Sequence, residues 1–278
     1  MKKSILLDVL KISVVLGLVW LAFAYFSGKL NTDLDLSISV ANEEKLGKVL
    51  VDDVLLNDSK IKLETNPIVD SAVQAITKRL VKSIGLTDYQ YTIRVIKSEE
   101  INAFTMPGGN IFVYTGLLKF AESPDEVAAV LAHEIGHAEN KHVVKRLAKE
   151  LGVALLFSIL SGGDAVVLNE VARTATSTVF DREQEREADD YCMSLMEKAK
   201  LNPKSLATFF RRVDEMTGDV DNNMEIIMTH PNNNSRIKNA LEYKLKPNFK
   251  TESFNMNWQR VIDSVNAGDE KASNDSIK

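Results

Sequence analysis

The stretch HEIGH, from His133 to His137, decides how this chain is interpreted. It lies in a segment predicted to form one helix, which begins at Ser123 and runs to about Lys149. Serine followed three residues later by glutamate, with proline at the first helical position, is typical of a helix N-terminus. Because residues i and i+4 share one helix face, the two imidazoles can bind the same metal ion.

Glu134, beside the first histidine, supplies a carboxylate for acid–base chemistry. Zinc lowers the pKa of a water molecule that it binds from about 16 to about 7, and a neighbouring glutamate can take the proton. The plain alternative is a surface helix with two histidines. Against it, the chain has only four histidines, and this pair lies among apolar residues, where unpartnered polar groups are costly. The sequence therefore predicts one Zn²⁺ per chain, bound by His133 and His137, with Glu134 as catalytic base.

A catalytic zinc ion needs a third protein ligand. His142 is five residues past His137 and is predicted to point off the ligand face, as a solvated residue or as a neighbour of a ligand. Further candidates crowd a later helical stretch: Glu183, Glu185, Glu187, Asp189 and Asp190. Glu185 and Asp189 share a helix face, so Glu185 can bind zinc while Asp189 accepts a hydrogen bond from a ligand imidazole. The plain alternative is a solvated acidic face.

Four motifs in this order resemble the HtpX-type gluzincin metallopeptidases, which include the CAAX prenyl endopeptidases and the periplasmic BepA-like proteases. The motifs are NAFTMPGG (102–109) with YTGLL (114–118), HEIGH (133–137), EREAD (185–189), and THP (229–231) with Arg236. The resemblance covers roughly residues 42–245. It implies a zincin-like fold, a zinc cofactor and endopeptidase activity. Several membrane spans are typical of the prenyl endopeptidases, whereas this sequence shows at most one, so prenylated substrates are not supported.

The same resemblance assigns roles to individual residues. It makes Glu185 the third zinc ligand. It places His230 and Arg236 near the metal, either stabilising the oxyanion or occupying the open zinc position in a latent state. It also places the strand Asn110 to Tyr114 at the cleft edge, where a peptide substrate can add as an extra strand.

The remaining pattern predicts a mainly α, α+β fold with a small sheet beside the HEIGH helix. Asn66-Pro67 is typical of a helix start, and Gly85 of its end. The other predicted elements are strands at 91–96, 102–106 and 110–114, with a turn at 107–109, and helical regions at 164–198, interrupted between 174 and 180, and at 203–216. A metalloprotease domain at 42–245 is followed by an extension at 246–278, whose end from Ala267 is predicted to be disordered.

The N-terminal segment carries the signal for cellular location. Lys2 and Lys3 precede an apolar run from Ile12 to Phe26, predicted as a hydrophobic helix. We assign residues 1–30 to a membrane anchor or a signal peptide, two alternatives that stay open. The lysines before this run place the bulk of the chain on the periplasmic or extracytoplasmic side of the cell envelope, anchored or secreted. The net charge of −5 argues against a nucleic-acid-binding protein.

The expected function is therefore zinc-dependent endoproteolysis of protein or peptide substrates, in cell-envelope protein quality control by resemblance. The alternative is a latent or inactive chaperone or scaffold module that retains the metalloprotease fold. The single cysteine, Cys192, lies in a helical run and is predicted to be a small core residue rather than a nucleophile.

Overall fold

The computed structural model describes residues 17–18, 20, 38–177, 179–216, 230 and 233–275. The chain divides into two units, Met1–Ser37 and Ile38–Lys278, and nearly all described residues belong to the second. Most of the predicted hydrophobic helix from Ile12 to Phe26 lies outside the described residues. None of the helices that the structure describes is both long enough and apolar enough to cross a membrane.

The described residues form one three-stranded sheet. Its strands are β1 (Thr92–Ile96), β2 (Ala103–Met106) and β3 (Asn110–Tyr114), in the order β1-β3-β2. β3 pairs in parallel with β1 and antiparallel with β2. Gly108 and Gly109 make the predicted turn between β2 and β3, with φ of 75° and 74°, values that favour glycine.

The predicted strands are confirmed, but the expected position of Asn110 to Tyr114 at the cleft edge is wrong. Hydrogen bonding to strands on both sides places β3 in the centre of the sheet. β2 is one of the two edge strands, and it contacts the helix that carries HEIGH. Any peptide that extends the sheet beside the metal site must therefore pair with β2.

The apolar core lies between one face of the sheet and helices α3 (Pro67–Ile84) and α5 (Pro124–Glu139). Ile111 and Val113 of β3 belong to this core. The side chain of Asn66 caps α3 by accepting a hydrogen bond from the backbone of Ile68, as its sequence position predicts. The chain before α3 forms α2 (Val40–Lys48), the π-helical turn η1 (Val49–Val54) and the short 3-10 turn η2 (Leu55–Asn57).

The helix that begins at Pro124 is shorter than predicted. α5 ends at Glu139, and a second helix, α6 (His142–Leu151), follows it. Lys141 separates them in the left-handed conformation, with φ 56° and ψ 31°. The basic residues up to Lys149 therefore belong to α6 rather than to the last turns of the metal helix. Proline stands at the start of α5 as predicted, but the side chain of Ser123 makes no capping hydrogen bond.

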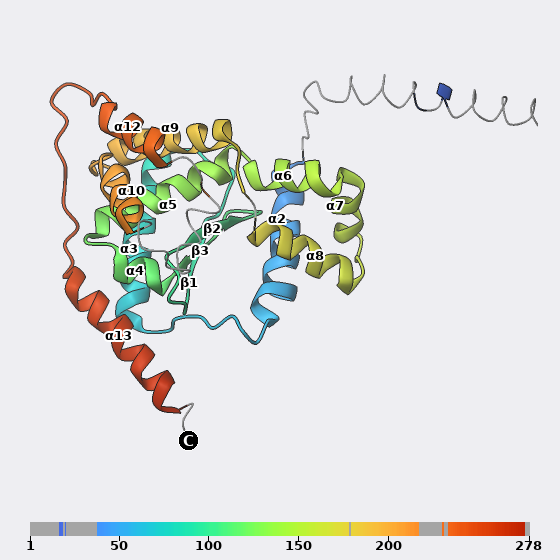
Figure 1. The fold of residues 1–278 in the computed structure, drawn as a ribbon, viewed down its shortest axis with the longest axis horizontal. Helices are drawn as coiled ribbons and strands as arrows, with labels where there is room; N and C mark the ends of the chain where they lie inside the picture. Colours follow the sequence, from blue (N-terminus) through green and yellow to red (C-terminus); the bar gives the residue numbers. More distant parts are fainter. Residues whose placement is uncertain are drawn as a thin grey trace, which may run out of the picture. The chain divides into compact units, whose positions relative to one another are not determined.

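The next helices are α7 (Val153–Leu160), α8 (Ala165–Thr176), α9 (Arg182–Lys198) and α10 (Ser205–Met216). Figure 1 shows α6, α7 and α8 gathered on the same side of the sheet as α2. The predicted interruption between 174 and 180 is confirmed. α9 begins after it with a capping box, in which Asp181 accepts from the backbone of Gln184 and the Gln184 side chain accepts from the backbone of Asp181. α9 packs along α5.

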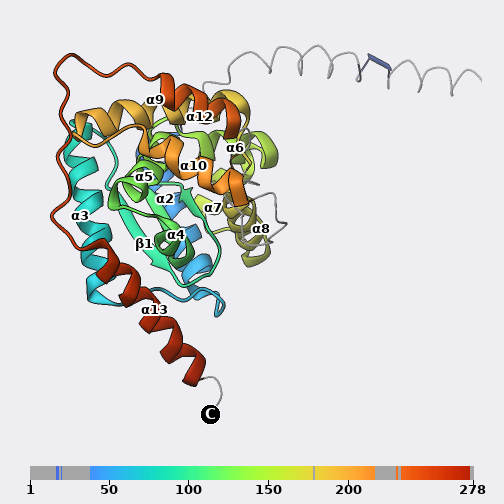
Figure 2. The ribbon, with the colours of Figure 1, turned by 60° about the vertical axis from the view of Figure 1, so that its left-hand side comes forward.

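Three further helices complete the described elements: α4 (Thr115–Phe120), α12 (Asn233–Glu242) and α13 (Trp258–Asp275). α13 runs beside α3 (Figure 2) and continues through Asp275, so the prediction of a disordered tail from Ala267 is wrong for the described part. Trp258, Val261 and Val265 of α13 join the apolar core, and the Trp258 indole N–H donates to the carbonyl of Ala121 at 2.8 Å. The extension after residue 245 thus packs on the domain.

Candidate metal centre

α5 and α9 approach each other closely because the fourth residue of HEIGH has no side chain. A Cβ atom built on Gly136 lies 2.8 Å from the carbonyl oxygen and 3.0 Å from the Cα of Ala188, both backbone atoms of α9. Contacts this short do not occur in a relaxed structure. Glycine at this position therefore lets α9 lie against α5, which brings the carboxylate of Glu185 to the two histidines.

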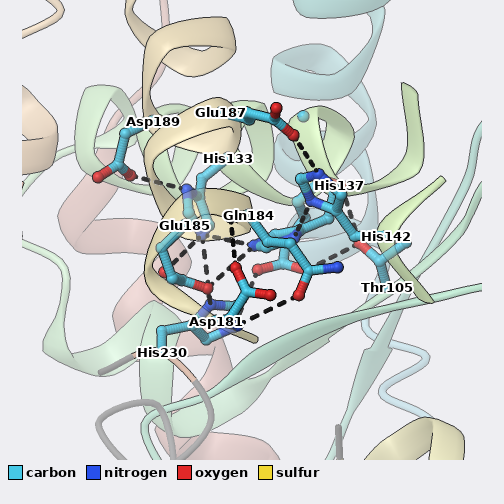
Figure 3. Close-up of polar contacts among 12 residues, drawn as sticks. Thr105, His133, His137, His142, Asp181, Gln184, Glu185, Glu187, Asp189 and His230 are labelled. Carbon is cyan, nitrogen blue, oxygen red and sulfur yellow. Dashed lines mark hydrogen bonds and ion pairs between the residues drawn. The ribbon is translucent and has the colours of Figure 1, made fainter. Parts of the chain in front are cut away.

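Four side chains from three parts of the chain converge on one point (Figure 3). One ligand atom each from His133, His137, Glu185 and His230 lies within 4.8 Å of every other. The two Nε2 atoms of His133 and His137 are 3.0 Å apart, and Glu185 Oε1 is 3.3 Å from His137 Nε2. All four residues are at most 2% exposed. The structure thus brings together both predicted histidines, the predicted third ligand and His230.

Asp189 lies where the sequence places it, behind the first histidine. Its Oδ1 is 2.9 Å from Nδ1 of His133. Arg236 donates to the same carboxylate twice, from Nε to Oδ2 and from Nη2 to Oδ1, each at 2.8 Å. Burial on its own raises the pKa of Asp189, but Arg236 and the hydrogen bond from His133 outweigh burial and lower the pKa to about 2. Asp189 is therefore an ionised acceptor that orients His133.

Arg236 is near the metal site, as predicted, but on the side of the carboxylates. Its Nη1 is 2.7 Å from Oε2 of Glu185, and its guanidinium carbon lies 4.1 Å from the centre of the Phe210 ring. Burial opposes its charge, yet Asp189 and Glu185 together raise its pKa. Burial raises the pKa of Glu185, but His230 and Arg236 outweigh burial, so the pKa of Glu185 lies well below its usual range. The geometry gives Arg236 the role of neutralising two buried carboxylates.

The structure contradicts the alternative in which His142 is a solvated residue. It is buried, and its Nδ1 lies 2.9 Å from Nδ1 of His137. Its other nitrogen, Nε2, is 3.0 Å from Oε2 of Glu187. Phe180 stacks on the face of the His137 ring, with centroids 3.8 Å apart. The second histidine of HEIGH is thus held at its edge by His142 and on its face by Phe180.

Glu134 is positioned by a residue of the edge strand. The hydroxyl of Thr105, in β2, lies 2.8 Å from Oε2 of Glu134 and 2.9 Å from the Glu134 carbonyl oxygen. The other carboxylate oxygen, Oε1, has no hydrogen-bond partner among the described residues and is 3.5 Å from Nε2 of His230. An unpaired buried carboxylate oxygen beside the cluster is an acceptor that is ready for a proton or a ligand.

His230 occupies the fourth corner of the cluster. Its Nδ1 is 2.9 Å from Oε1 of Glu185 and 3.3 Å from Nε2 of His133. Burial lowers its pKa, but the neighbouring carboxylate of Glu185 outweighs burial, and the net shift is upward. His230 is therefore near the metal position, as the resemblance implied, with geometry that suits a ligand.

The donor set fits a zinc ion. Histidine Nε2 atoms and a carboxylate oxygen are the ligands of catalytic zinc sites. His133 uses Nδ1 to contact Asp189, and His137 uses Nδ1 to contact His142, so both Nε2 atoms are directed to the centre. Two imidazole nitrogens 3.0 Å apart beside a carboxylate form a place for a cation, which the ligand side chains surround.

Three neighbours of this centre are not identifiable from the sequence pattern: Thr105, Phe180 and Glu187. Thr105 lies in a strand segment where threonine is common, and Phe180 lies in an interruption between helices, so neither has a local signal. Glu187 stood among the acidic residues that the sequence left unassigned. For its partner, His142, the sequence leaves a solvated position and a position beside a ligand open, and the structure shows the second.

Comparison with known proteins identifies the family. The model of peptidase family M48 matches residues 67–244. The chain is 28% identical over 184 residues to the mitochondrial metalloendopeptidase OMA1 of Schizosaccharomyces pombe, covering 65% of this chain and 55% of that protein. It is 24% identical to the beta-barrel assembly-enhancing protease of Escherichia coli, over 99% of this chain and 60% of that protein. The chain therefore spans a little over half the length of these relatives.

The family match covers well over half of the chain and includes HEIGH, Glu185, His230 and Arg236. The geometry of the buried donor cluster agrees with it, since M48 peptidases use zinc. The chain belongs to peptidase family M48, a family of zinc metallopeptidases.

Proposed function

We propose that this chain is a zinc-dependent endopeptidase that hydrolyses peptide bonds in protein substrates. One observation carries the proposal. Four donor side chains have ligand atoms within 4.8 Å of one another in a buried centre, and the carboxylate of Glu134 borders it with one oxygen that accepts no hydrogen bond from the described residues. Family membership supports the same conclusion.

His133, His137 and Glu185 hold the zinc ion in this proposal, and Asp189 and Arg236 keep His133 and Glu185 in place. When bound, zinc supplies a Lewis acid that polarises the scissile carbonyl and makes water acidic enough to act near neutral pH. Glu134 Oε1 takes the proton of the attacking water and later delivers it to the nitrogen of the leaving amine. Thr105 holds Oε2 of the same carboxylate, so the proton-accepting oxygen faces the donor cluster.

The substrate chain is proposed to pair with β2. This strand is at the edge of the sheet, and Thr105 within it contacts Glu134, so a peptide hydrogen-bonded along β2 passes beside the catalytic carboxylate. An added strand takes its affinity from backbone hydrogen bonds, which every peptide sequence can supply, and this suits cleavage of varied protein sequences. α8 contacts β2 in the described state, and the ligand residues are buried. Entry of a substrate therefore requires that this side of the domain opens.

The second candidate is a latent protease, or a scaffold that retains the fold. The position of His230 favours it, because its Nδ1 lies 2.9 Å from Glu185 Oε1 at the corner of the cluster that a substrate carbonyl needs. Replacing His230 by alanine distinguishes the possibilities. A latent enzyme gains activity, whereas an enzyme that uses His230 to stabilise the oxyanion loses activity, by analogy with a typical 10²- to 10³-fold cost for one such donor. A scaffold stays inactive in both forms.

We further propose that the protein works in the cell envelope, on the extracytoplasmic side, in protein quality control. The charge pattern of residues 1–30 supports this location, with the segment acting as anchor or signal. The printed name of the Escherichia coli relative, a beta-barrel assembly-enhancing protease, supports a role in handling envelope proteins. Partners in this proposal are protein or peptide substrates and, if the segment is retained, the membrane.

The decisive experiment measures metal content and proteolysis of the full chain together. The expected result is one zinc per wild-type chain, strong loss of zinc in Glu185→Gln, and zinc retained without casein cleavage in Glu134→Gln. Zinc retained in Glu185→Gln reassigns the third ligand to His230, the remaining member of the donor cluster. Absence of zinc from wild type after purification with zinc present removes the proposal.

A further inference from the structure

The contact between His137 and His142 has no part in the reaction described above. The two Nδ1 atoms lie 2.9 Å apart, and His142 Nε2 lies 3.0 Å from Glu187 Oε2. His142 is fully enclosed, whereas the side chain of Glu187 is 44% exposed. The three residues therefore form a chain of polar contacts from the solvent to a zinc ligand (Figure 3).

The contact exists only because the helix breaks after Glu139. In a continuous helix a residue five positions after His137 lies about 140° away around the axis, where its side chain cannot meet the first. Lys141 adopts the left-handed conformation, which is unfavourable for a residue with a side chain. Asn140 supports the break by donating from its side chain to the carbonyl of Gly136 at 2.8 Å. The fold thus keeps an unfavourable backbone conformation that returns His142 to His137.

The carboxylate at the outer end decides where the protons lie. An ionised carboxylate only accepts hydrogen bonds, so His142 must present Nε2–H to Glu187. A neutral imidazole carries a single N–H, and the 3.0 Å contact with Glu187 places it on Nε2 of His142. Its Nδ1 is then an acceptor, and the hydrogen between the rings belongs to Nδ1 of His137. The Nε2 of His137 is left with its lone pair directed at Glu185 and the metal position.

His133 also has a carboxylate behind its Nδ1, but here no second histidine lies between the ring and the carboxylate. Asp189 accepts directly from Nδ1 of His133 at 2.9 Å. Glu185, Glu187 and Asp189 follow one another at every second position of α9, so this one helix reaches the metal position and the outer side of both imidazoles. Carboxylates behind metal-binding histidines fix the tautomer and raise ligand basicity.

We propose that His142 and Glu187 are positioning residues that hold His137 in the tautomer with Nε2 free to bind zinc. The inference rests on the proposed function only in naming zinc as the ion. Glu187 is the acidic residue that acts on His137, and it acts through His142. Because the Glu187 carboxylate is exposed, loss of its charge at the surface changes the affinity of the site for the metal.

The test compares zinc affinity, by competition with a chromogenic chelator, across full-length variants. His142→Phe keeps a ring but removes the acceptor, and zinc binding is expected to weaken 10- to 100-fold. His142→Asn offers an amide oxygen to the N–H of His137 and is expected to recover most of that loss. Glu187→Gln gives an intermediate loss. Glu183→Gln is the same change on the same helix, at a residue whose ion-pair partner is Arg186, and it leaves affinity unchanged.

A second readout uses the metal-free protein. Long-range ¹H–¹⁵N NMR correlations distinguish the two tautomers of each ring, and the chain has only four histidines to assign. Wild type is expected to show His137 with hydrogen on Nδ1, and His142→Phe a mixture of tautomers. Unchanged zinc affinity in His142→Phe, or a wild-type His137 with hydrogen on Nε2, overturns the inference. If wild type binds no zinc, the proposed function fails while the tautomer measurement still decides this inference.

Discussion

Replacing Arg236 by methionine tests how the buried charges of the metal centre are balanced. The guanidinium makes two contacts of 2.8 Å with Asp189 and one of 2.7 Å with Glu185, and all three residues are buried. Removing one partner of a buried ion pair typically costs about 3–5 kcal/mol, because the remaining charge keeps its desolvation penalty. We expect that loss in the free energy of unfolding of the metal-free protein near pH 7, measured with urea.

The pH dependence of this loss is a more specific test of the role of Arg236 than its size. In wild type the pKa of Asp189 is about 2, against an ordinary value of 3.8. A lowered carboxyl pKa stabilises the fold above the ordinary value, by about 2 kcal/mol for this shift, and about half of that is lost by pH 3. Without Arg236 the pKa of Asp189 rises from about 2, because fewer interactions then oppose burial, and this contribution to stability becomes smaller. The difference between wild type and Arg236→Met must therefore shrink as the pH falls from 5 to 3.

Two controls complete the experiment. Arg173→Met removes an arginine that pairs with Glu170 at 2.6 Å, where both side chains are more than half exposed, and a much smaller loss is expected because exposed ion pairs contribute little. Saturating zinc should reduce the loss in Arg236→Met, because the ion supplies positive charge to Glu185. A loss below about 1 kcal/mol that does not change with pH would refute the role of Arg236 as the balancing charge.

Three other predictions follow from the same contacts. Thr105→Val removes a hydrogen bond to a charged group, worth about 1.5–3 kcal/mol, so kcat/KM for casein should fall at least tenfold while zinc content stays constant. The control, Thr115→Val, breaks a buried contact with Ser98 and should lower stability without this loss in kcat/KM. Gly136→Ala should cost about 1–3 kcal/mol of stability, because the new side chain forces α5 and α9 apart, and it should weaken zinc binding. Gly268→Ala, where the new side chain meets only flexible side-chain ends, should be neutral or stabilising, and equal effects of the two changes in thermal unfolding would contradict the close packing at Gly136. Zinc at 100 times its Kd should stabilise the chain by about 2.7 kcal/mol, and calorimetry should show no such shift in Glu185→Gln.

The two histidine ligands were predictable because local geometry determines them: helix periodicity alone puts His133 and His137 on one face. Periodicity also pairs Glu185 with Asp189, but the choice of Glu185 as third ligand among the acidic residues of that stretch came from the family resemblance. The strands and the start of α3 were predictable for the same reason, from alternation and from the Asn66-Pro67 cap. Each of these features depends on residues fewer than five positions apart.

The errors concern properties that local sequence does not contain. Nothing near Lys141 forbids a continuous helix, and the break depends on tertiary contacts such as its Nζ with the carbonyl of Ile38 at 3.1 Å. Strand order is also non-local, so alternation identified β3 but not its central place. The helix α13 is a different kind of error. Trp258, Val261 and Val265 have helical spacing just before Ala267, so the sequence already indicates a helix there, and the error was to end it where the composition becomes polar.

The five residues of HEIGH show how one helix satisfies several demands at once. His133 and His137 face the donor cluster, and Glu134 faces Thr105 of the sheet edge. Ile135 lies in the apolar core at 1% exposure, so a polar residue there would destabilise the helix that carries both ligands. Gly136 lies against Ala188 of α9, where any side chain pushes Glu185 away. The two positions of the motif that bind nothing are therefore fixed by packing as firmly as the three that carry the chemistry.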